Sequence, residues 1–548
     1  MNRKLLQVYV SPRMEAFFHC LVLCAITFSV YFKSLGNSFV YDDNSKVVAN
    51  AVYRNFDLQR IFFGLGNGLE WLPLRDLTYA IDFALWGENP IGFHVSNLVI
   101  YSINIVAVYL FTGLLVRMFN NEPEPSVETR YIPFFTALLF AVHPIHSEAV
   151  SMIFTRNVLV SGLFFFLTCY VFLYVDRKNV RPGAPCSVAI LGLYVCSVLS
   201  KVTTIILPLT LPLLLLTPPV KQRFHKWKNV IILLSFFMIC FYVFFKEVAK
   251  RARILNADVS TLSDLAERLC VAIQIPVFYL GKLLFPSNLT IEYDIAFASG
   301  LLDWKTCSSL VILISLFVAA IVLRRSLPQL FFGLFWYLVT MVPVLNLFGT
   351  VPIVADRYLY LPSYGLLFFI VVIFFKTGRW QTQRRFVLIS MTILLACITV
   401  RQNEFYRNDV VLWEHALATS PQSIKAQKNL GWSYYHAGSH EKALEAFTML
   451  KEVRPNDFSY ELALGLRQVE QKNWSAAIPP LLIALEKKED SLYVLYLLGT
   501  AYRNLGEYSK ALFCFERILV SKESDFSGYH ETARNNIGYL ESLLQKTK

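Results

Sequence analysis

Charged side chains are scarce in this sequence, and long apolar runs take their place. Asp, Glu, Lys and Arg make up 16% of the 548 residues, against roughly 25% in a typical soluble protein. A soluble chain of this length would divide into several domains with charged surfaces. Here the apolar runs are about 15–25 residues long, enough to cross a hydrocarbon core of roughly 30 Å. The composition therefore predicts a polytopic membrane protein.

The sequence also lacks a CxxC pair and a signal-peptide cleavage site. Its 10 cysteines are scattered, mostly inside apolar runs, which indicates membrane-packing thiols rather than a disulfide framework or a zinc site. The first apolar run, at about 16–35, is not followed by the small residues at which a signal peptide is cleaved. We therefore expect this run to be a retained first span.

The net charge of +12 lies mainly in short connectors between apolar runs, at 176–181, 221–228, 324–325 and 376–385. Excess Lys and Arg in short loops marks the cytoplasmic side of a membrane, so this placement argues against nucleic acid as the partner. We predict about eleven spans, near 16–35, 92–116, 131–142, 157–175, 187–200, 203–217, 229–246, 306–323, 330–348, 362–375 and 386–400. The N-terminus would then be cytoplasmic and the C-terminus outside. Residues 264–285 are predicted to form a re-entrant or surface helix.

The opposite set of connectors is long and rich in polar and charged residues. These outer loops are expected at 36–91, 143–156, 247–305 and 349–361. Functional groups concentrate in loops that a rigid scaffold holds. We therefore expect any chemistry on this outer face.

From about residue 402 the composition becomes that of a soluble protein, and a repeat begins. Gly431, Gly465 and Gly499 are each 34 residues apart, which is the period of tetratricopeptide repeats. The sequence predicts an all-α chain with a membrane domain at 1–401 and a helical solenoid at 402–548. The solenoid would comprise a partial repeat at 402–423, full repeats at 424–457, 458–491 and 492–525, and a capping helix at 526–548.

An acidic pair, Asp42 and Asp43, follows the first predicted span. One carboxylate of such a pair could remove a proton from an acceptor hydroxyl as a general base. The other would raise the pKa of the first or help to bind a divalent metal ion. A solvated turn at the membrane surface is the alternative reading of the same two residues.

The second outer loop carries His143, His146 and Glu148. The two histidines have a spacing that zinc ligands use, but no third ligand with matching spacing is visible. Hydrogen bonds to a sugar, or to the backbone of a re-entrant turn, are the two roles that we favour for them. His94 and Asn97 would share one face of the second span and give it a polar patch.

Three cations recur at predicted membrane boundaries: Arg156, Lys201 and Arg357. They suit a phosphate site, because Arg grips an anion with two N–H groups and Lys supplies a point charge. Tyr358 beside Arg357 would complete a clamp on a lipid phosphate. The alternatives are snorkelling to the interface and, for Arg357, a structural ion pair with its neighbour Asp356.

Taken in order, these motifs resemble a known family. The matching stretches include "VYDDN", "WLPLRDLTYAIDFALWG", "LFAVHPIHSEAV", "VFYLGKLLFPSNLTIEY" and "VADRYLYLP". They are similar to the GT-C class of polytopic glycosyltransferases that carry tetratricopeptide repeats, namely the transmembrane and tetratricopeptide repeat O-mannosyltransferases and their bacterial relatives. The resemblance covers nearly the whole chain.

The resemblance implies an inverting enzyme that moves a sugar from a polyprenyl-phosphate carrier to an acceptor hydroxyl on the outer face. In this class the first outer loop supplies the catalytic carboxylate, here Asp42 or Asp43. Lys201, Arg357 and Arg156 would stabilise the departing phosphate. The residues expected to contact sugar or acceptor are Glu148, His143, His146, His94, Asn97, Asp356 and Tyr358.

Mannose as the sugar, and protein Ser or Thr as the acceptor, are implied by the resemblance alone. The repeats are expected to hold the acceptor polypeptide. Two other readings stay open: a membrane-anchored scaffold whose repeats recruit a partner, and a transporter of lipid-linked sugars. The short repeat array favours a bacterial inner membrane with the repeats in the periplasm, and the alternative is the endoplasmic reticulum with the repeats in the lumen.

Overall fold

The computed structural model describes most of the chain, and every regular element in the described part is helical. The described residues are 12–64, 71–120, 129–177, 184–216, 262–297, 300, 302–347, 353–375, 381–521 and 528–546. The predicted span at 229–246 and the basic connector at 221–228 lie outside them. The chain divides into two compact units, Met1–Asn408 and Asp409–Lys548, which are taken here one at a time. The expected all-α class is confirmed.

Six helical segments of the first unit are long and apolar enough to cross a membrane. They are Arg13–Gly36, Pro90–Phe119, Arg156–Val175, Trp304–Leu323, Asp356–Phe375 and Thr382–Glu404. These segments coincide with six of the predicted spans. They correspond to α1 (Pro12–Tyr31) with η1 (Phe32–Gly36), α5 (Pro90–Asn120), α8 (Arg156–Arg177), α13 (Trp304–Leu323), η7 (Asp356–Leu359) with α15 (Tyr360–Phe375), and α16 (Gln381–Glu404).

Four further predicted spans correspond to shorter apolar helices of 10–17 residues: Ile132–Val142, Pro185–Ser200, Val202–Leu214 and Pro328–Val344. They correspond to α6 (Ile132–Val142), α9 (Ala184–Ser200), η4 (Val202–Ile206) with α10 (Leu207–Leu216), and α14 (Pro328–Met341) with η6 (Val342–Val344). Three of them begin or end in a tight 3-10 turn. Irregular backbone at membrane depth is tolerated only where protein buries it or where it lines a cavity, so these turns are where a site is expected.

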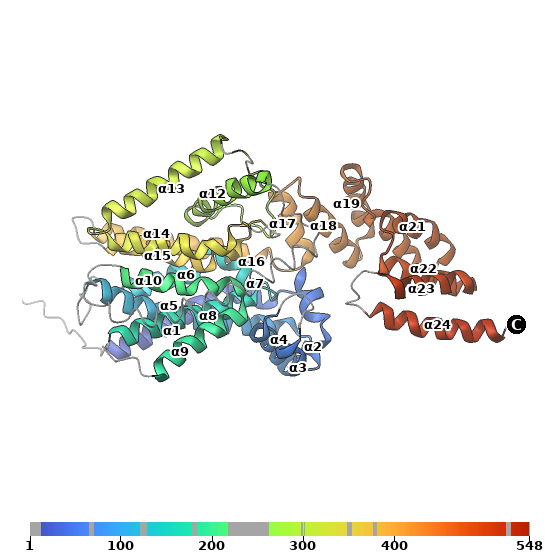
Figure 1. Cartoon of the computed structure of the whole chain (residues 1–548), viewed down its shortest axis with the longest axis horizontal. Coiled ribbons are helices and arrows are strands. Elements are labelled where there is room, and N and C mark those ends of the chain that lie inside the picture. The colour runs from blue at the N-terminus through green and yellow to red at the C-terminus, as the bar shows by residue number, and fades with distance from the viewer. Residues whose placement is uncertain are drawn as a thin grey trace, which may run out of the picture. The chain divides into compact units, whose positions relative to one another are not determined.

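The core of the first unit is aromatic and is built around α5, α8, α14 and α15. Trp336 on α14 is fully buried against Phe111, Phe166 and Tyr364 from the other three helices. Figure 1 shows α14 and α15 running side by side, and their contact is among the most extensive in the unit. By contrast, only 17% of the apolar window of α13 is buried, and its main contacts among the described elements are with α12 (Leu262–Leu284) and α14.

Short elements between the long helices form the polar end of this unit. They are η2 (Asp43–Val48), α2 (Ala51–Arg54), α3 (Leu58–Phe63), α4 (Pro73–Trp86), η3 (Pro144–His146) and α7 (Ser147–Ser151). The helix α12, at the predicted re-entrant position, carries Glu267, Arg268 and Lys282 and is not among the helices apolar enough to span. Outer-loop segments thus fold into helices instead of extended loops.

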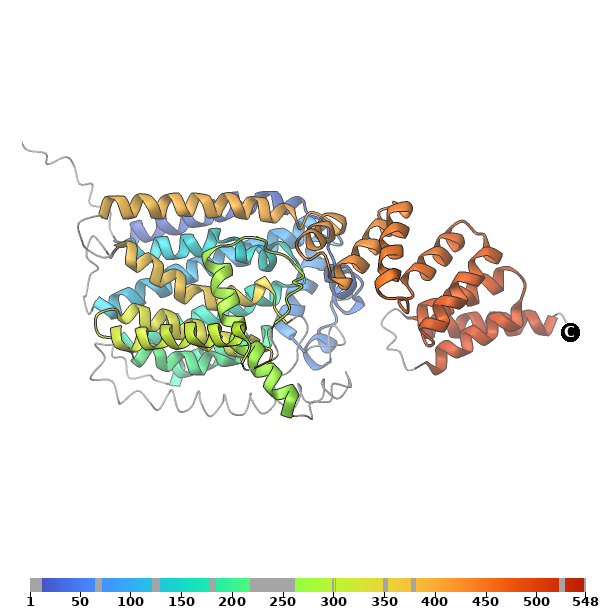
Figure 2. The ribbon, with the colours of Figure 1, turned by 90° about the horizontal axis from the view of Figure 1, so that it is seen from above.

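The second unit is an array of antiparallel helix pairs (Figure 2). Its helices are α17 (Asp409–Thr419), α18 (Ile424–His436), α19 (His440–Val453), α20 (Ser459–Glu470), α21 (Trp474–Lys487), α22 (Leu492–Asn504), α23 (Tyr508–Val520) and α24 (Tyr529–Lys546). Each predicted glycine lies where a partner helix comes close, since a Cβ at Gly499 would stand 2.9 Å from the Phe515 ring. Ala443, Ala477 and Ala511 are fully buried in the same interfaces.

Candidate functional site

Four 3-10 turns meet at one end of the membrane unit and bring distant loops together. The turn η3 contacts η7, and η4 contacts η6. The chain therefore breaks its helices where residues from about 144, 202, 342 and 356 converge. Each turn interrupts the hydrogen-bond ladder of its helix, so some backbone N–H and C=O groups there bond to other partners.

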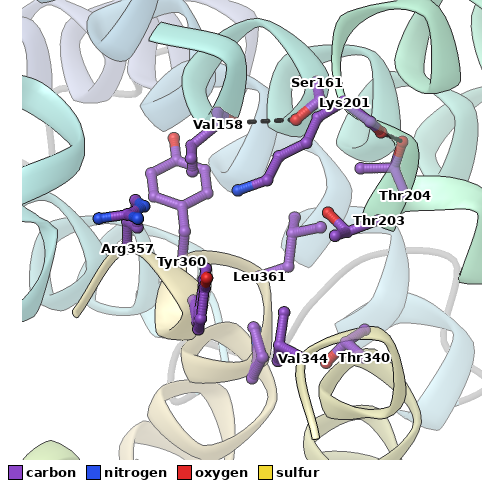
Figure 3. Close-up of a pocket in the computed structure, with 12 residues that line it drawn as sticks. Val158, Ser161, Lys201, Thr203, Thr204, Thr340, Val344, Arg357, Tyr360 and Leu361 are labelled. Atoms are coloured by element: carbon purple, nitrogen blue, oxygen red, sulfur yellow. Dashed lines mark hydrogen bonds between the residues drawn. The ribbon is translucent and has the colours of Figure 1, made fainter. Parts of the chain in front are cut away.

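A small cavity with an internal volume of about 30 Å³ lies among these turns, and Lys201 and Arg357 both line it (Figure 3). Tyr358 connects them, because its ring centroid is 5.8 Å from Lys201 Nζ and 5.3 Å from Arg357 Cζ. The described residues that line it are Val158, Ser161, Lys201, Thr203, Thr204, Thr340, Val344, Arg357, Tyr358, Tyr360, Leu361 and Pro362. This described lining combines two cations with several hydroxyls and contains no carboxylate.

Arg357 is held in place by Glu148, which comes from α7. The Glu148 carboxylate accepts a 2.8 Å bond from the Arg357 backbone N–H through Oε2 and pairs with the guanidinium through Oε1. The Glu148 side chain is fully buried, whereas that of Arg357 keeps 20% exposure. One carboxylate therefore fixes both ends of Arg357 while the guanidinium still reaches the cavity.

Tyrosines hold the two residues that precede Arg357. The Tyr279 hydroxyl donates to the Ala355 carbonyl at 2.9 Å and accepts from the Ala355 N–H at 2.8 Å. The Tyr293 hydroxyl donates to Asp356 Oδ1 at 2.6 Å, and Asp356 is 2% exposed. Three consecutive residues are thus each anchored by a different segment of the chain.

The acidic pair divides into one buried and one partly exposed carboxyl group. Asp43 is fully buried, and its two oxygens accept from the N–H groups of Val40 and Phe154, at 3.1 and 2.6 Å. Burial raises the pKa of Asp43 to about 7, although these N–H bonds oppose the shift. Asp42 keeps partial exposure. Neither residue lines the cavity, but Asp43 ties the first outer loop to the segment between Glu148 and Arg156.

Arg156 is placed away from the cavity, in a buried network with α4 and α5. Its guanidinium pairs with Asp82 Oδ2 at 2.5 Å and donates to Asn97 Oδ1 at 2.6 Å and to the Phe93 carbonyl at 2.9 Å. The Arg156 side chain has no exposure. Burial raises the pKa of Asp82, and the positive charge of Arg156 opposes that rise. His94, 2% exposed, lies close to the same network.

The two histidines of the second outer loop are buried and hydrogen-bonded to protein. His143 Nδ1 accepts from the Ile145 N–H at 3.2 Å, so its Nε2–H donates to the Leu283 carbonyl at 3.0 Å. His146 contacts the Phe140 carbonyl at 2.8 Å through Nδ1 and the Ser363 hydroxyl at 3.0 Å through Nε2. Burial lowers the pKa of His143 to about 4 and that of His146 to about 3. Both are neutral at pH 7.

The structure thus brings together some of the predicted site residues and separates others. Lys201, Arg357 and Tyr358 share the cavity, with Glu148 behind Arg357. The predicted residues that are buried and bonded to other protein groups instead are Asp43, Asn97, His143, His146, Arg156 and Asp356, and His94 is buried near Arg156. Among the described residues, no group of three or more His, Cys, Asp or Glu side chains is arranged to hold a metal ion.

Sequence reasoning missed Asp82, Tyr279 and Tyr293. Tyr279 and Tyr293 both lie within the stretch 277–293 that carried part of the resemblance. A tyrosine in an apolar stretch looks like packing material, because its hydroxyl partner is distant in the chain. The pairing of Tyr293 with Asp356 could have been predicted only from the presence of a carboxyl group in another apolar stretch, that of Asp356.

A helical membrane unit with paired buried charges at a cavity, followed by helix-pair repeats, defines a polytopic membrane protein with a tetratricopeptide array. The tetratricopeptide repeat family model matches residues 427–457 and 493–521. The chain is a distant homologue of protein O-mannosyl-transferases and carries its own tetratricopeptide repeats near its C-terminus.

Three of these relatives match the chain at similar levels. Protein O-mannosyl-transferase F38B6.6 of Caenorhabditis elegans is 23% identical over 437 residues, which cover 76% of this chain and 60% of the relative. The mouse TMTC3 protein is 23% identical, with 81% of this chain and 52% of the relative covered. The human TMTC4 protein is 24% identical, with 80% and 66% covered. The chain thus spans between about half and two thirds of the length of these relatives.

Proposed function

We propose that this protein is a membrane glycosyltransferase that moves mannose from a polyprenyl-phosphate carrier to a hydroxyl of a protein acceptor. The observation that carries the proposal is the convergence of Lys201 and Arg357 on one cavity, between broken helices. A phosphate leaving group needs positive charge where negative charge develops. The relatives are named as protein O-mannosyl-transferases, which supports the reaction class.

Lys201 and Arg357 would bind the donor phosphate. Arg357 offers a planar set of N–H donors that Glu148 orients, and Lys201 adds a mobile point charge. Hydroxyls of Thr203 and Thr340 lie on the same lining and suit hydrogen bonds to a sugar or a phosphate. Because Arg156 is enclosed by Asp82, Asn97 and Phe93, we assign it to holding the outer loops in place instead of binding phosphate.

We assign the general base to Asp42. Asp43 uses both carboxylate oxygens to accept backbone N–H groups, so it serves as the anchor of the loop, while Asp42 keeps partial exposure. The Asp42 carboxylate would take the proton of the acceptor hydroxyl as that oxygen attacks the anomeric carbon. The bond from this carbon to the phosphate oxygen breaks, polyprenyl phosphate leaves, and the anomeric configuration inverts.

The four short apolar helices and the predicted span at 229–246 would complete about eleven crossings with the six long segments. Loops at 36–91 and 143–156 would then face outward, opposite the basic connectors. The animal sources of the relatives favour the endoplasmic reticulum over the bacterial inner membrane. The repeats would lie on the same outer side.

The acceptor polypeptide would bind to the repeats. The second unit has a groove between α22, α23 and α24, lined by Arg503, Asn504, Tyr508, Asn535, Asn536, Tyr539 and Leu543. Carboxamide side chains carry both a donor and an acceptor, so Asn535 matches the peptide groups of an extended chain, whereas Asn504 and Asn536 already donate to the Thr500 and Thr532 carbonyls and Asn536 also accepts from Arg503. Arg503 is the charged residue of this lining, which favours an acidic residue in the acceptor.

The test uses the full chain in lipid nanodiscs, with radiolabelled polyprenyl-phosphate mannose and a pool of secretory proteins as acceptors. Wild type should transfer label, and Asp42→Asn should lower the rate by roughly 10²–10⁴-fold, the contribution of a general base. Arg357→Gln and Lys201→Gln should weaken donor binding. Transfer that survives Asp42→Asn would contradict the assignment of the base. Donor binding by none of the proteins, with the repeats still capturing a partner, would favour the scaffold reading.

A further inference from the structure

Two buried carboxylates flank a single guanidinium beside the cavity. Glu148 pairs with Arg357, and Asp356 directly precedes Arg357 in the chain. Asp356 is 2% exposed and Glu148 is 1% exposed. A carboxylate without a partner in such a place is costly, and a nearby cation is the first partner available to it. Both carboxylates could therefore form an ion pair with Arg357.

Asp356 takes a different partner. Its Oδ1 accepts the Tyr293 hydroxyl at 2.6 Å, and in the described part of the chain it forms no ion pair with Arg357. A distance of 2.6 Å is at the short end of the range for a hydrogen bond between a hydroxyl and a carboxyl oxygen. The tyrosine hydroxyl, and not the guanidinium, is therefore the partner of Asp356 Oδ1.

The Tyr293 ring is itself held in position. Lys282 Nζ lies 5.1 Å from the ring centroid, and the same amine donates to the carbonyls of Ser287 and Asn288 at 2.8 and 3.2 Å. Phe278 packs edge-on against the ring at 5.5 Å. Tyr293, which belongs to the segment that follows α12, thus contacts Asp356 with its hydroxyl while Lys282 and Phe278 contact its ring.

We propose that Tyr293 is a positioning residue, which holds Asp356 off Arg357 so that the guanidinium faces one carboxylate and keeps N–H donors for an anionic phosphate. This inference rests on the proposed function, since the phosphate is that of the lipid-linked donor. Without the hydroxyl, Asp356 is left beside two cations, Lys282 and Arg357. Because Lys282 already donates to the Ser287 and Asn288 carbonyls, Asp356 turns to Arg357, which then lies between two carboxylates. A second carboxylate within hydrogen-bonding distance repels the phosphate and occupies the donors that would bind it.

The experiment measures binding of polyprenyl phosphate, without sugar, to the full chain in nanodiscs. Tyr293→Phe should weaken binding by about tenfold, which corresponds to about 1.4 kcal/mol. Asp356→Asn should bind as well as wild type or better, because the competing charge is gone. The double variant Tyr293→Phe with Asp356→Asn should regain most of the affinity. In transfer assays, Tyr293→Phe should raise the KM for the donor and leave kcat nearly unchanged.

Tyr337→Phe is the matched control, since Tyr337 is also buried and donates its hydroxyl to a protein oxygen, the Pro276 carbonyl at 2.5 Å. It removes the same atom without touching a carboxylate and should leave polyprenyl-phosphate affinity near wild type. If Tyr293→Phe fails to fold, Asp356→Asn alone decides, because a tenfold loss in that variant would overturn the proposal.

The outcomes separate this inference from the function on which it rests. Wild type that binds polyprenyl phosphate, with Tyr293→Phe unchanged, overturns the positioning role alone. A double variant that binds as weakly as Tyr293→Phe shows a structural defect and also overturns it. Wild type that does not bind polyprenyl phosphate overturns the donor assignment, and the positioning role with it.

Discussion

At the scale of single residues, the buried ion pairs differ in whether the arginine side chain lines the cavity. Arg75 pairs with Asp76 at 2.7 Å with both side chains fully buried. Arg156 is as deeply enclosed by Asp82. The Arg357 side chain keeps 20% exposure and lines the cavity. Exposure and lining, and not charge alone, therefore separate the cation that can bind a ligand from those that hold the fold together.

Arg156→Lys tests that separation. Lysine keeps the charge but, with one compact ammonium, cannot reproduce the bonds to Asp82, Asn97 and the Phe93 carbonyl together, and each lost hydrogen bond that involves a charged group costs roughly 1.5–3 kcal/mol. We expect a clearly lower thermal unfolding temperature in detergent, with unchanged polyprenyl-phosphate affinity in the folded fraction. If Arg156→Lys instead bound polyprenyl phosphate more weakly at an unchanged unfolding temperature, Arg156 would be assigned to the phosphate site.

Asp43 predicts a pH dependence of stability with a defined sign. Burial raises its pKa from 3.8 to about 7 in the fold, so between those values the folded protein holds a proton that the unfolded chain has lost. Stability from this group is complete below about pH 4 and is lost as the pH rises to about 7. Compared with Asp43→Asn, wild type should therefore lose stability between pH 5 and pH 7, as measured by thermal unfolding.

Asp43→Asn carries its own constant penalty, because one amide oxygen cannot accept from both Val40 and Phe154. That penalty does not change with pH, so the difference between the two proteins, rather than either melting temperature, is the observable. A difference that stays flat from pH 5 to pH 8 would show that Asp43 is ionised throughout that range.

At the scale of elements, the sequence predicted what depends on local pattern. The long spans and the repeat helices were found because apolar length and a 34-residue period are written into neighbouring residues. The tight turns that end α6, precede α10 and follow α14 were not found. A helix can end early in a membrane only where segments distant in the sequence provide hydrogen-bond partners for its free backbone groups. The residues next to the helix do not indicate which segments these are.

The candidate site was predictable in its residue types and not in its pairings. Lys201 and Arg357 stood out as charges at membrane boundaries. Their partners did not, because Arg357 bonds to Glu148 over 209 residues and Tyr293 bonds to Asp356 over 63. Local sequence therefore separated Arg156 from Arg357 poorly, although one lies in a closed network and the other at a cavity.

The crossing of α14 and α15 sets the position of the site, and Gly365→Ala tests it. A Cβ at Gly365 would lie 2.5 Å from the Gly333 carbonyl oxygen, so the two helices must separate. Because α15 follows η7 directly and α14 leads into η6, that movement displaces Arg357 and Val344 together. We expect a loss of roughly 1–3 kcal/mol in stability, typical of overpacking, and weaker binding of polyprenyl phosphate.

Gly192→Ala is the matched control for that change. Gly192 lies inside α9, and a Cβ there meets no atom within 4 Å. Alanine in an exposed helix interior is favoured over glycine by up to about 1 kcal/mol. This variant should be as stable as wild type or slightly more so. Equal behaviour of both alanine variants would contradict the role of the close crossing.

At the scale of the whole molecule, the proposed reaction requires the repeats and the outer loops to share one side of the membrane. The repeat unit contains a natural reporter of its side. Asn473, Trp474 and Ser475 form an Asn-X-Ser sequence at the start of α21, and Asn473 is exposed. Such a sequence receives an N-linked glycan only where the chain enters the secretory lumen.

The protein expressed in animal cells should therefore carry a glycan on Asn473. Treatment with an N-glycosidase should increase its gel mobility, and Asn473→Gln should show the loss of one glycan before treatment, whereas Ser475→Thr, which preserves the acceptor sequence, should keep it. Because Asn288 begins a second acceptor sequence in a predicted outer loop, both variants are compared in an Asn288→Gln background. A C-terminal tag should also resist protease added to sealed microsomes. Digestion of that tag, together with no glycan on Asn473, would place the repeats in the cytosol. The groove at Arg503 could then not present a lumenal acceptor, and the repeats would have to serve a cytosolic partner.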